Sequence, residues 1–158
     1  MKRFAATAAA ALAAFTIATP AQAKTHPVEV LLNLIADTGT TVVVDDARIC
    51  KNKTTFGMYE FEKDVIDQLT ICAANHKGDE AELFDTVLHE SVHVVQACKG
   101  DTIFGHASIM AEANPKEATF VAAEYPRDQF VSEMEARVIA SQMDIRLVIN
   151  LVEKFCFE

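Results

Sequence analysis

Between residues 79 and 98 the apolar positions recur every three or four residues, which is the period of a helix with one buried face. Asp79 is a suitable N-cap, and the acidic residues just after it complement the positive end of the helix dipole. The pattern stops at Lys99 and Gly100. Its apolar positions are Leu83, Phe84, Val87, Leu88, Val92 and Val95. The sequence therefore predicts a well-defined helix in the middle of the chain.

The segment before this helix predicts a small sheet. A short helix is expected over residues 28–36. Strands are expected over residues 40–49, 56–61 and 65–72, because these segments are rich in β-branched and aromatic side chains. The last of them also fits a helix, but its β-branched content favours a strand.

The segment after the central helix is predicted to be mostly helical. Residues 101–114 are expected to form a loop. A helix should then run from Asn114 to Tyr125, with Asn114 as its cap and Pro115 at its first position. One long helix is expected over residues 128–155, with the apolar stripe Val131, Met134, Val138, Ile145, Val148 and Val152. A small three-stranded sheet followed by helices is an α+β fold.

Residues 1–23 are expected to be a secretory signal peptide. Lys2 and Arg3 begin it, an uncharged Ala-rich run follows, and Ala-Gln-Ala at its end places small residues where a signal peptidase cuts. The run is shorter than the ~20 residues that cross a bilayer. We expect cleavage after Ala23, a single mature domain over residues 24–158, and a secreted or periplasmic protein with no stable membrane insertion.

Export to an oxidising compartment changes the interpretation of the four cysteines, which would then form two disulfides with three possible connectivities. No two are spaced as Cys-x-x-Cys, so a zinc site made of cysteines is disfavoured. We expect Cys50–Cys72, because both end neighbouring predicted strands, and Cys98–Cys156, which would join two helix ends. Each would stabilise the fold by ~2–4 kcal/mol.

The composition narrows the class of protein. A chain of 158 residues usually forms one domain, and a hydrophobic content of 51% is too high for a disordered chain. The formal net charge is −9 and the pI is about 5.0, so the basic surface of a nucleic-acid-binding protein is absent. We therefore exclude nucleic acid as a partner. We also expect a monomer.

The central helix carries the motif His89-Glu90-Ser91-Val92-His93. Two histidines four residues apart project from one helix face, so both rings can reach a single Zn²⁺ ion. Glu90 is rotated away from that stripe and can act as a general base on a zinc-activated water. Apart from the motif residues, no charge or proline occurs between Thr86 and Gln96, and such an apolar setting strengthens electrostatic interactions at a metal.

The motif and its uncharged surroundings resemble the gluzincin clan of zinc metallopeptidases. The resemblance covers two helices, at about residues 79–98 and 128–155, and implies a minimal zincin fold. The metzincin variant of the motif is excluded, because Gln96 and Lys99 stand where it has glycine and histidine.

In a gluzincin the third zinc ligand is a glutamate from a later helix, and this chain offers Glu133 and Glu135. The segment resembles the Glu-x-x-Ala pattern of minimal gluzincins, which would make Glu133 the ligand. Residues two apart on a helix point ~200° from each other, so only one of the two can face the metal. Glu133 shares its stripe with Ala136 and Ala140, which would allow close helix packing, and Glu135 remains the alternative.

Other side chains are weaker candidates. His106 could be a ligand or could stabilise the transition state, although a histidine in a predicted loop is more often a surface residue. Tyr125 and Tyr59 could each donate a hydrogen bond to the oxyanion of a hydrolysed peptide. His26 and His76 are weaker candidates for the site than His106.

The resemblance implies an exported zinc peptidase that cuts peptide or protein substrates, with a shallow cleft where a peptide adds to the sheet as a strand. Two alternatives stay open. One is a non-catalytic zinc-binding protein on a peptidase-like scaffold, although such a protein would not need Glu90. The other is a disulfide-stabilised secreted interaction domain in which the motif is accidental.

Overall fold

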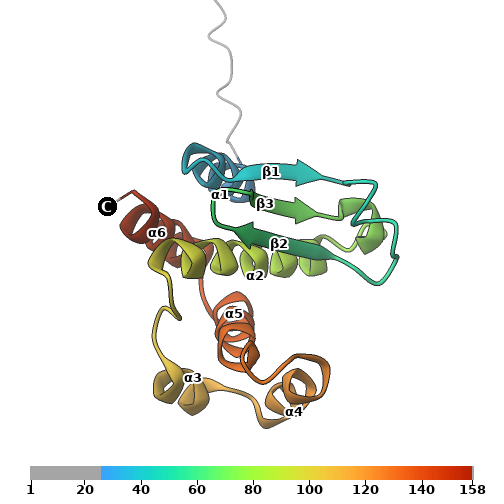
Figure 1. Cartoon of the computed structure of the whole chain (residues 1–158). Helices are drawn as coiled ribbons and strands as arrows, with labels where there is room; N and C mark the ends of the chain where they lie inside the picture. Colours follow the sequence, from blue (N-terminus) through green and yellow to red (C-terminus); the bar gives the residue numbers. More distant parts are fainter. Residues whose placement is uncertain (1–25, 158) are drawn as a thin grey trace, which may run out of the picture.

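The computed structural model of this protein describes residues 26–157. The elements are, in chain order, α1 (Pro27–Asp37), β1 (Thr41–Val44), β2 (Gly57–Glu62), β3 (Ile66–Ile71), the 3-10 helix η1 (Ala73–His76), α2 (Glu80–Lys99), α3 (His106–Glu112), α4 (Pro115–Glu124), α5 (Phe130–Gln142) and α6 (Ile145–Cys156). The predicted signal peptide and its cleavage site lie outside the described residues. The α+β class and the sheet that precedes the helices are confirmed (Figure 1).

The three strands form one mixed sheet in the order β1-β3-β2. β3 lies in the centre, parallel to β1 and antiparallel to β2, with Leu69 opposite both Val42 and Tyr59. β2 is therefore an edge strand. The helical alternative for the third strand is wrong.

The first strand is shorter than predicted. It ends at Val44, because Asp45 adopts a left-handed conformation (φ 56°) that turns the chain out of the sheet. The carboxylate of Asp46 then accepts hydrogen bonds from the backbone N–H groups of Arg48 and Ile49, which closes a turn. The β-branched run alone did not reveal this turn.

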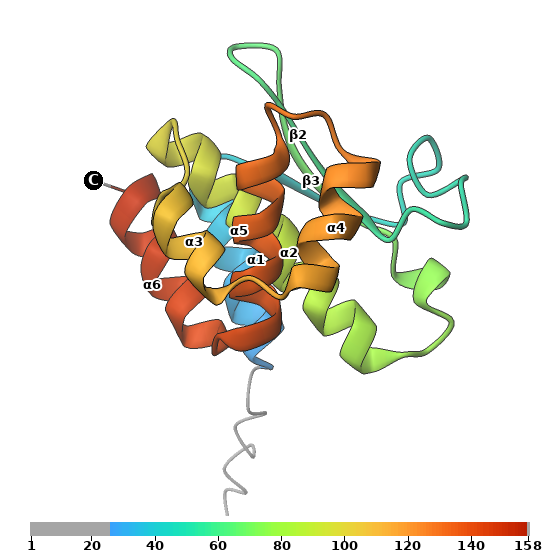
Figure 2. The same ribbon diagram turned by 90° about the horizontal axis from the view of Figure 1, so that it is seen from below.

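α2 is the central element, and it lies between the sheet and α5 (Figure 1). Asp79 caps its start by accepting hydrogen bonds from the N–H groups of Ala81 and Glu82, as the sequence predicted. Gly100 ends it in the left-handed conformation (φ 77°), which glycine adopts without strain. From below, α5 crosses in front of α2, with α3 and α4 on its two sides (Figure 2).

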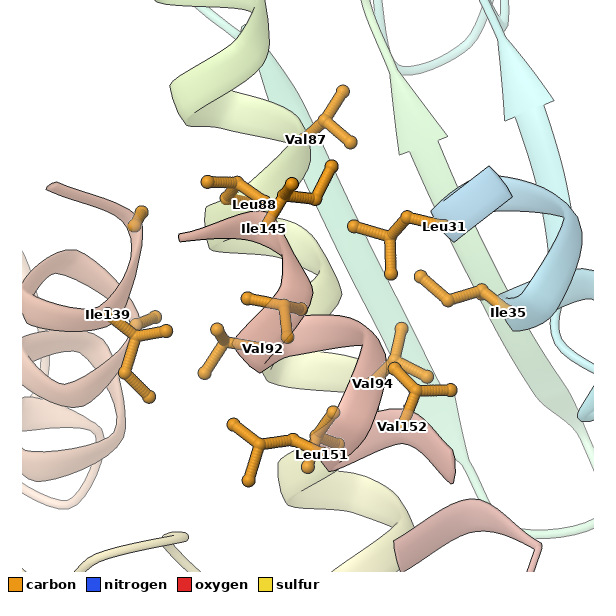
Figure 3. Close-up of a cluster of buried hydrophobic side chains, with 14 of the residues drawn as sticks. Leu31, Ile35, Val87, Leu88, Val92, Val94, Ile139, Ile145, Leu151 and Val152 are labelled. Carbon is orange, nitrogen blue, oxygen red and sulfur yellow. The ribbon is translucent and has the colours of Figure 1, made fainter. Parts of the chain in front are cut away.

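The main hydrophobic core surrounds α2, as Figure 3 shows. The labelled side chains of α2 point toward α1 and α6, and Ile139 reaches the same core from α5. The labelled residues are Leu31, Ile35, Val87, Leu88, Val92, Val94, Ile139, Ile145, Leu151 and Val152. Because this core contacts several faces of α2, the helix is held rigidly along its length.

The C-terminal helical segment is divided into α5 and α6, whereas the sequence predicted one helix. The chain is extended at Met143, and Asp144 caps α6 by accepting a hydrogen bond from the N–H group of Arg146. The break was hidden because Val138 and Ile145 are seven residues apart, close to two helical turns, so the apolar stripe continues across it.

The predicted loop over residues 101–114 also contains a helix, α3, which is seven residues long. α3 and α4 pack on the face of α5 that points away from the main core. Ile109, Val121, Met134 and Val138 form a second, smaller cluster there. One face of α5 therefore packs on α2, and another holds α3 and α4.

Both expected disulfides are present, Cys50–Cys72 and Cys98–Cys156. Cys50 lies in the loop after β1 rather than at a strand end, while Cys98 and Cys156 join the last turns of α2 and α6. Two disulfides fit a protein of an oxidising, extracellular compartment. Within residues 26–157, no helix has both the length and the apolar character needed to span a membrane.

The two disulfides should differ in their contribution to stability. Their cysteines are 58 and 22 residues apart, and a longer closed loop restricts the unfolded chain more. We expect Cys98→Ala/Cys156→Ala to lower the free energy of unfolding by about 4 kcal/mol, and Cys50→Ala/Cys72→Ala by about 3 kcal/mol. Urea unfolding of both variants measures this. A larger loss for the Cys50–Cys72 pair would contradict the expected order.

Candidate metal centre

α2 places the two motif histidines on one face. His89 and His93 are four residues apart and leave the helix one turn apart in the same direction. Their Nε2 atoms are 3.2 Å apart, and the planes of the two rings are inclined at 79°. Both rings therefore direct the same type of nitrogen atom toward one point.

α5 brings Glu133 to that point. Its Oε2 atom lies 3.4 Å from Nε2 of His89, and its Oε1 atom lies 3.5 Å from Nε2 of His93. Ligand atoms around a tetrahedral zinc ion are about 3.3 Å apart, given zinc–ligand bonds of roughly 2 Å. All three observed separations are close to this value.

Two further observations fit a cation at this position. Within residues 26–157, one group of three side chains of metal-binding types has ligand atoms that all lie within 4.8 Å of one another. It consists of His89, His93 and Glu133. Oε2 of Glu133 is also buried without a hydrogen-bond partner in the described residues. An unpartnered buried carboxylate oxygen is costly, so it is well suited to contact a bound cation.

The charges of these side chains depend on one another. Burial raises the pKa of Glu133, but the close contacts with the imidazoles of His89 and His93 outweigh it and lower that pKa to about 2. Burial lowers the pKa of His93, but the interactions with Glu133 and Glu90 outweigh it and raise that pKa above its ordinary value. Glu133 is therefore a stable anion that attracts a positive charge, either a proton on an imidazole or a metal cation.

The pKa of Glu90 is shifted in the opposite direction to that of Glu133. Only 9% of the residue is exposed, and burial raises the pKa of its carboxyl group. The His89 and His93 rings and the backbone of Tyr59 oppose this shift without cancelling it. A carboxylate whose pKa is raised accepts a proton more readily than an ordinary carboxylate, which suits the role of a general base.

Gly57 on β2 allows the sheet to approach Glu90 closely. A Cβ atom at this position would lie 2.7 Å from Cγ of Glu90 and 2.8 Å from Cγ2 of Thr86, both far inside normal contact. The absence of a side chain thus lets the edge strand pack against α2 beside the motif. The carboxylate of Glu90 is held between the strand and the histidine pair.

The side chains of His89, His93, Glu133 and Glu90 line a cavity of about 550 Å³. Its wall is formed by the edge strand, by α2, and by α5 with the segment before it. The lining residues are Gly57, Met58, Tyr59, Phe61, His89, Glu90, His93, Tyr125, Gln129, Ser132 and Glu133. A substrate that enters this cavity reaches the two carboxylates and the two imidazoles together.

Tyr125, Tyr59 and His106 were the other candidates, and they differ in their positions. Tyr125 lines the cavity. Tyr59 also lines it, but its hydroxyl donates a hydrogen bond to Asp67 at 3.0 Å. His106 is exposed and lines a neighbouring cavity beyond Gln96, so its predicted role at the centre is wrong.

His26 and His76 have local contacts elsewhere in the fold. His26 caps α1 by accepting a hydrogen bond from the N–H group of Val28. His76 is buried against Phe56, with its Nδ1 atom 3.2 Å from a carboxylate oxygen of Glu82. Neither lines the cavity of the candidate centre.

Glu135 is not beside the histidine pair, which excludes it as the alternative third member of this group. Its side chain is fully buried and points to the segment that follows α2. There it accepts hydrogen bonds from the backbone N–H groups of Ile103 and Phe104, each at 2.7 Å, and from the side chain of Gln96 at 2.8 Å. The expectation that Glu133 and Glu135 face different directions is confirmed.

Sequence reasoning missed Gly57 and Gln96. Gly57 lies in a segment read only as a strand, and a glycine inside a strand can signal close approach of another backbone or side chain. Gln96 follows His93 by three residues, so its position on the same helix face was available from helical spacing. Helical spacing did not predict its hydrogen-bond partners on α5, which are Ser132 and Glu135.

Gly57→Ala should destabilise the protein, because the added methyl group overlaps Glu90 and Thr86. We expect the free energy of unfolding to fall by about 1–3 kcal/mol, as is usual for overpacked sites. Urea unfolding measures the loss. Gly57→Ala/Thr86→Ser removes one of the two overlapping groups and should recover part of it. Equal stability of the wild type and Gly57→Ala would show that β2 can move away freely.

Comparisons with curated proteins and with solved structures found no match to this chain. A protein-family model matches residues 24–157, and its description is Domain of unknown function (DUF8637). The match begins at the residue that follows Ala23 and includes α2 and α5, which carry the candidate centre. With nearly the whole chain matched, the protein belongs to the DUF8637 family.

Proposed function

We propose that this protein is an exported zinc-dependent peptidase. The observation that carries the proposal is the convergence of His89, His93 and Glu133, since the two Nε2 atoms are 3.2 Å apart and each has a carboxylate oxygen of Glu133 within 3.5 Å. Two imidazoles and one carboxylate leave the fourth corner open, as in catalytic rather than structural zinc sites. All three side chains line the cavity.

Each side chain has a defined task in this proposal. Zinc bound to the three ligands would polarise a peptide carbonyl and favour ionisation of water at neutral pH. Glu90 accepts a proton from the water that attacks the carbonyl carbon, and it returns that proton to the amine nitrogen when the C–N bond breaks. Tyr125 lines the same cavity, and its hydroxyl is a hydrogen-bond donor for the carbonyl oxygen as that oxygen gains negative charge.

The edge strand supports a peptide as the substrate. β2 pairs with β3 on one side only, so its other side has backbone N–H and C=O groups available for an added strand. Met58, Tyr59 and Phe61 of this strand line the cavity. A peptide bound along β2 would present its backbone to Glu90 and to the zinc ligands.

The order of the elements also supports the resemblance to gluzincins. A small sheet precedes the helix that bears His89, Glu90 and His93, and a later helix supplies the glutamate. The metal ligands come from α2 and α5, which pack directly against each other. A site on two packed helices holds its ligands more precisely than a site on loops.

Zinc content and hydrolysis should respond differently to substitutions. We expect one zinc per chain in the wild type, its loss in His93→Ala, and its retention in Glu90→Gln. Glu90→Gln should hydrolyse an unfolded protein substrate about 10²–10⁴-fold more slowly, because the proton acceptor is gone. Metal analysis of purified protein and a cleavage assay with and without a chelator measure both effects.

His106→Ala is the matched control, since this histidine lies outside the cavity and should affect neither readout. Full activity of Glu90→Gln would remove the general-base role. Zinc binding without any hydrolysis would instead indicate a non-catalytic zinc protein. A wild-type protein that binds no zinc would point to a disulfide-stabilised interaction domain.

Export is part of the proposal. We expect the mature protein to begin at Lys24, after cleavage of the signal peptide at Ala23. Intact-mass measurement of protein recovered from the extracellular or periplasmic fraction tests this. Recovery of the full-length chain in the cytoplasm would contradict it.

A further inference from the structure

Gln96 joins the histidine pair to a buried carboxylate. It lies on α2, one turn beyond His93, and only 9% of the residue is exposed. Its Oε1 atom is 2.8 Å from Nδ1 of His93. Its Nε2 atom is 2.8 Å from Oε2 of Glu135 and 3.0 Å from the backbone oxygen of Ser132. All polar atoms of this carboxamide therefore have partners.

These partners fix the orientation of the carboxamide. Both carboxylate oxygens of Glu135 accept backbone N–H groups, from Ile103 and Phe104, so Glu135 acts as an acceptor throughout. The oxygen of Ser132 can also only accept. An amide nitrogen has two hydrogens to donate, whereas a flipped carboxamide would place its oxygen against two acceptors. The nitrogen must therefore face Glu135 and Ser132, and the oxygen must face His93.

The orientation of Gln96 in turn selects the tautomer of His93. The amide oxygen can only accept a hydrogen bond, so Nδ1 of His93 must carry the hydrogen. In the neutral ring the lone pair is then on Nε2. Nε2 is the atom that lies 3.2 Å from Nε2 of His89 and 3.5 Å from Oε1 of Glu133. The nitrogen that faces the candidate metal position is thus the one that is free to bind.

We propose that Gln96 and Glu135 are positioning residues that hold His93 with its hydrogen on Nδ1 and its Nε2 lone pair toward the metal position. This inference rests on the proposed function. Glu135 is fully buried and also holds the backbone at Ile103 and Phe104. The network therefore links α2, α5 and the segment between α2 and α3 around one ligand.

The effect should be specific to His93. In the described part of the chain, His89 makes no hydrogen bond through Nδ1, so nothing comparable restricts its ring. Without Gln96, the His93 ring can rotate, and neutral His93 can place its hydrogen on Nε2. Both changes must be reversed before a metal ion binds, which weakens the affinity. Loss of such an outer hydrogen bond to a metal-binding histidine lowers metal affinity about 10–100-fold.

The first experiment reads the tautomer directly. Ring ¹⁵N chemical shifts of His93 are recorded by NMR for zinc-free wild type and for zinc-free Gln96→Met, which has a similar length and no hydrogen-bonding amide. At alkaline pH, where the ring is neutral, we expect hydrogen on Nδ1 in the wild type and a mixture of tautomers in the variant. This measurement needs neither bound zinc nor peptidase activity. An unchanged tautomer in Gln96→Met would overturn the proposal.

The second experiment measures zinc affinity by competition with a chelator. Gln96→Met should bind zinc about 10–100-fold more weakly than the wild type. Gln142→Met is the matched control, because Gln142 is an exposed residue of α5 whose side chain donates a hydrogen bond to the backbone oxygen of Glu112 and does not line the cavity of the candidate centre. It should bind zinc as the wild type does. If Gln96→Met does not fold, Gln96→Asn has an amide too short to reach His93 and Glu135 together, and it should show the same loss.

The outcomes separate this inference from the proposed function. A wild type that binds zinc, with equal affinity in the Gln96 variants, would overturn the positioning role and leave the peptidase proposal intact. A wild type that binds no zinc would overturn the peptidase proposal whatever the tautomer of His93. Weaker zinc binding together with a mixed tautomer supports the positioning role.

Discussion

The packing of α5 against α2 is the contact on which the candidate centre depends. Ala136 and Ala140 are buried in the main core, and their small side chains allow the two helices to approach closely. Glu133 precedes Ala136 by three residues on the same stripe of α5, so it reaches the histidines of α2. A larger side chain on that stripe would separate the helices and withdraw the carboxylate.

Glu90, Glu133 and Glu135 have different surroundings, which give these three glutamates different properties. Glu133 is held as an anion by the two imidazoles, with its pKa lowered to about 2. Burial raises the pKa of Glu90. Glu135 is fully buried and accepts three hydrogen bonds that tie one helix to the next segment. One residue type thus offers a ligand, a proton carrier and a structural acceptor, since the pKa of a carboxyl group depends on burial, charge and hydrogen bonding.

The scaffold keeps these groups in place from several sides. The sheet packs on α2 at Gly57, where only a residue without a side chain leaves room for Glu90. The Cys98–Cys156 disulfide ties the end of α2 to α6, and the core around α1 and α6 fixes the rest of the helix. Support from several sides is what holds the side chains of a site in fixed positions.

The sequence by itself determined the elements and the chemistry of α2. Helical spacing placed His89 and His93 on one face, Asp79 and Gly100 bounded the helix, and β-branched runs gave the strands. These are local properties, because they depend on residues a few positions apart. Only the tertiary structure decided that Glu133 rather than Glu135 meets the histidines, that Gly57 contacts Glu90, and that Gln96 reaches Glu135. Such contacts join residues 33 to 44 positions apart. They depend on how helices and strands cross, which periodicity along the chain does not specify.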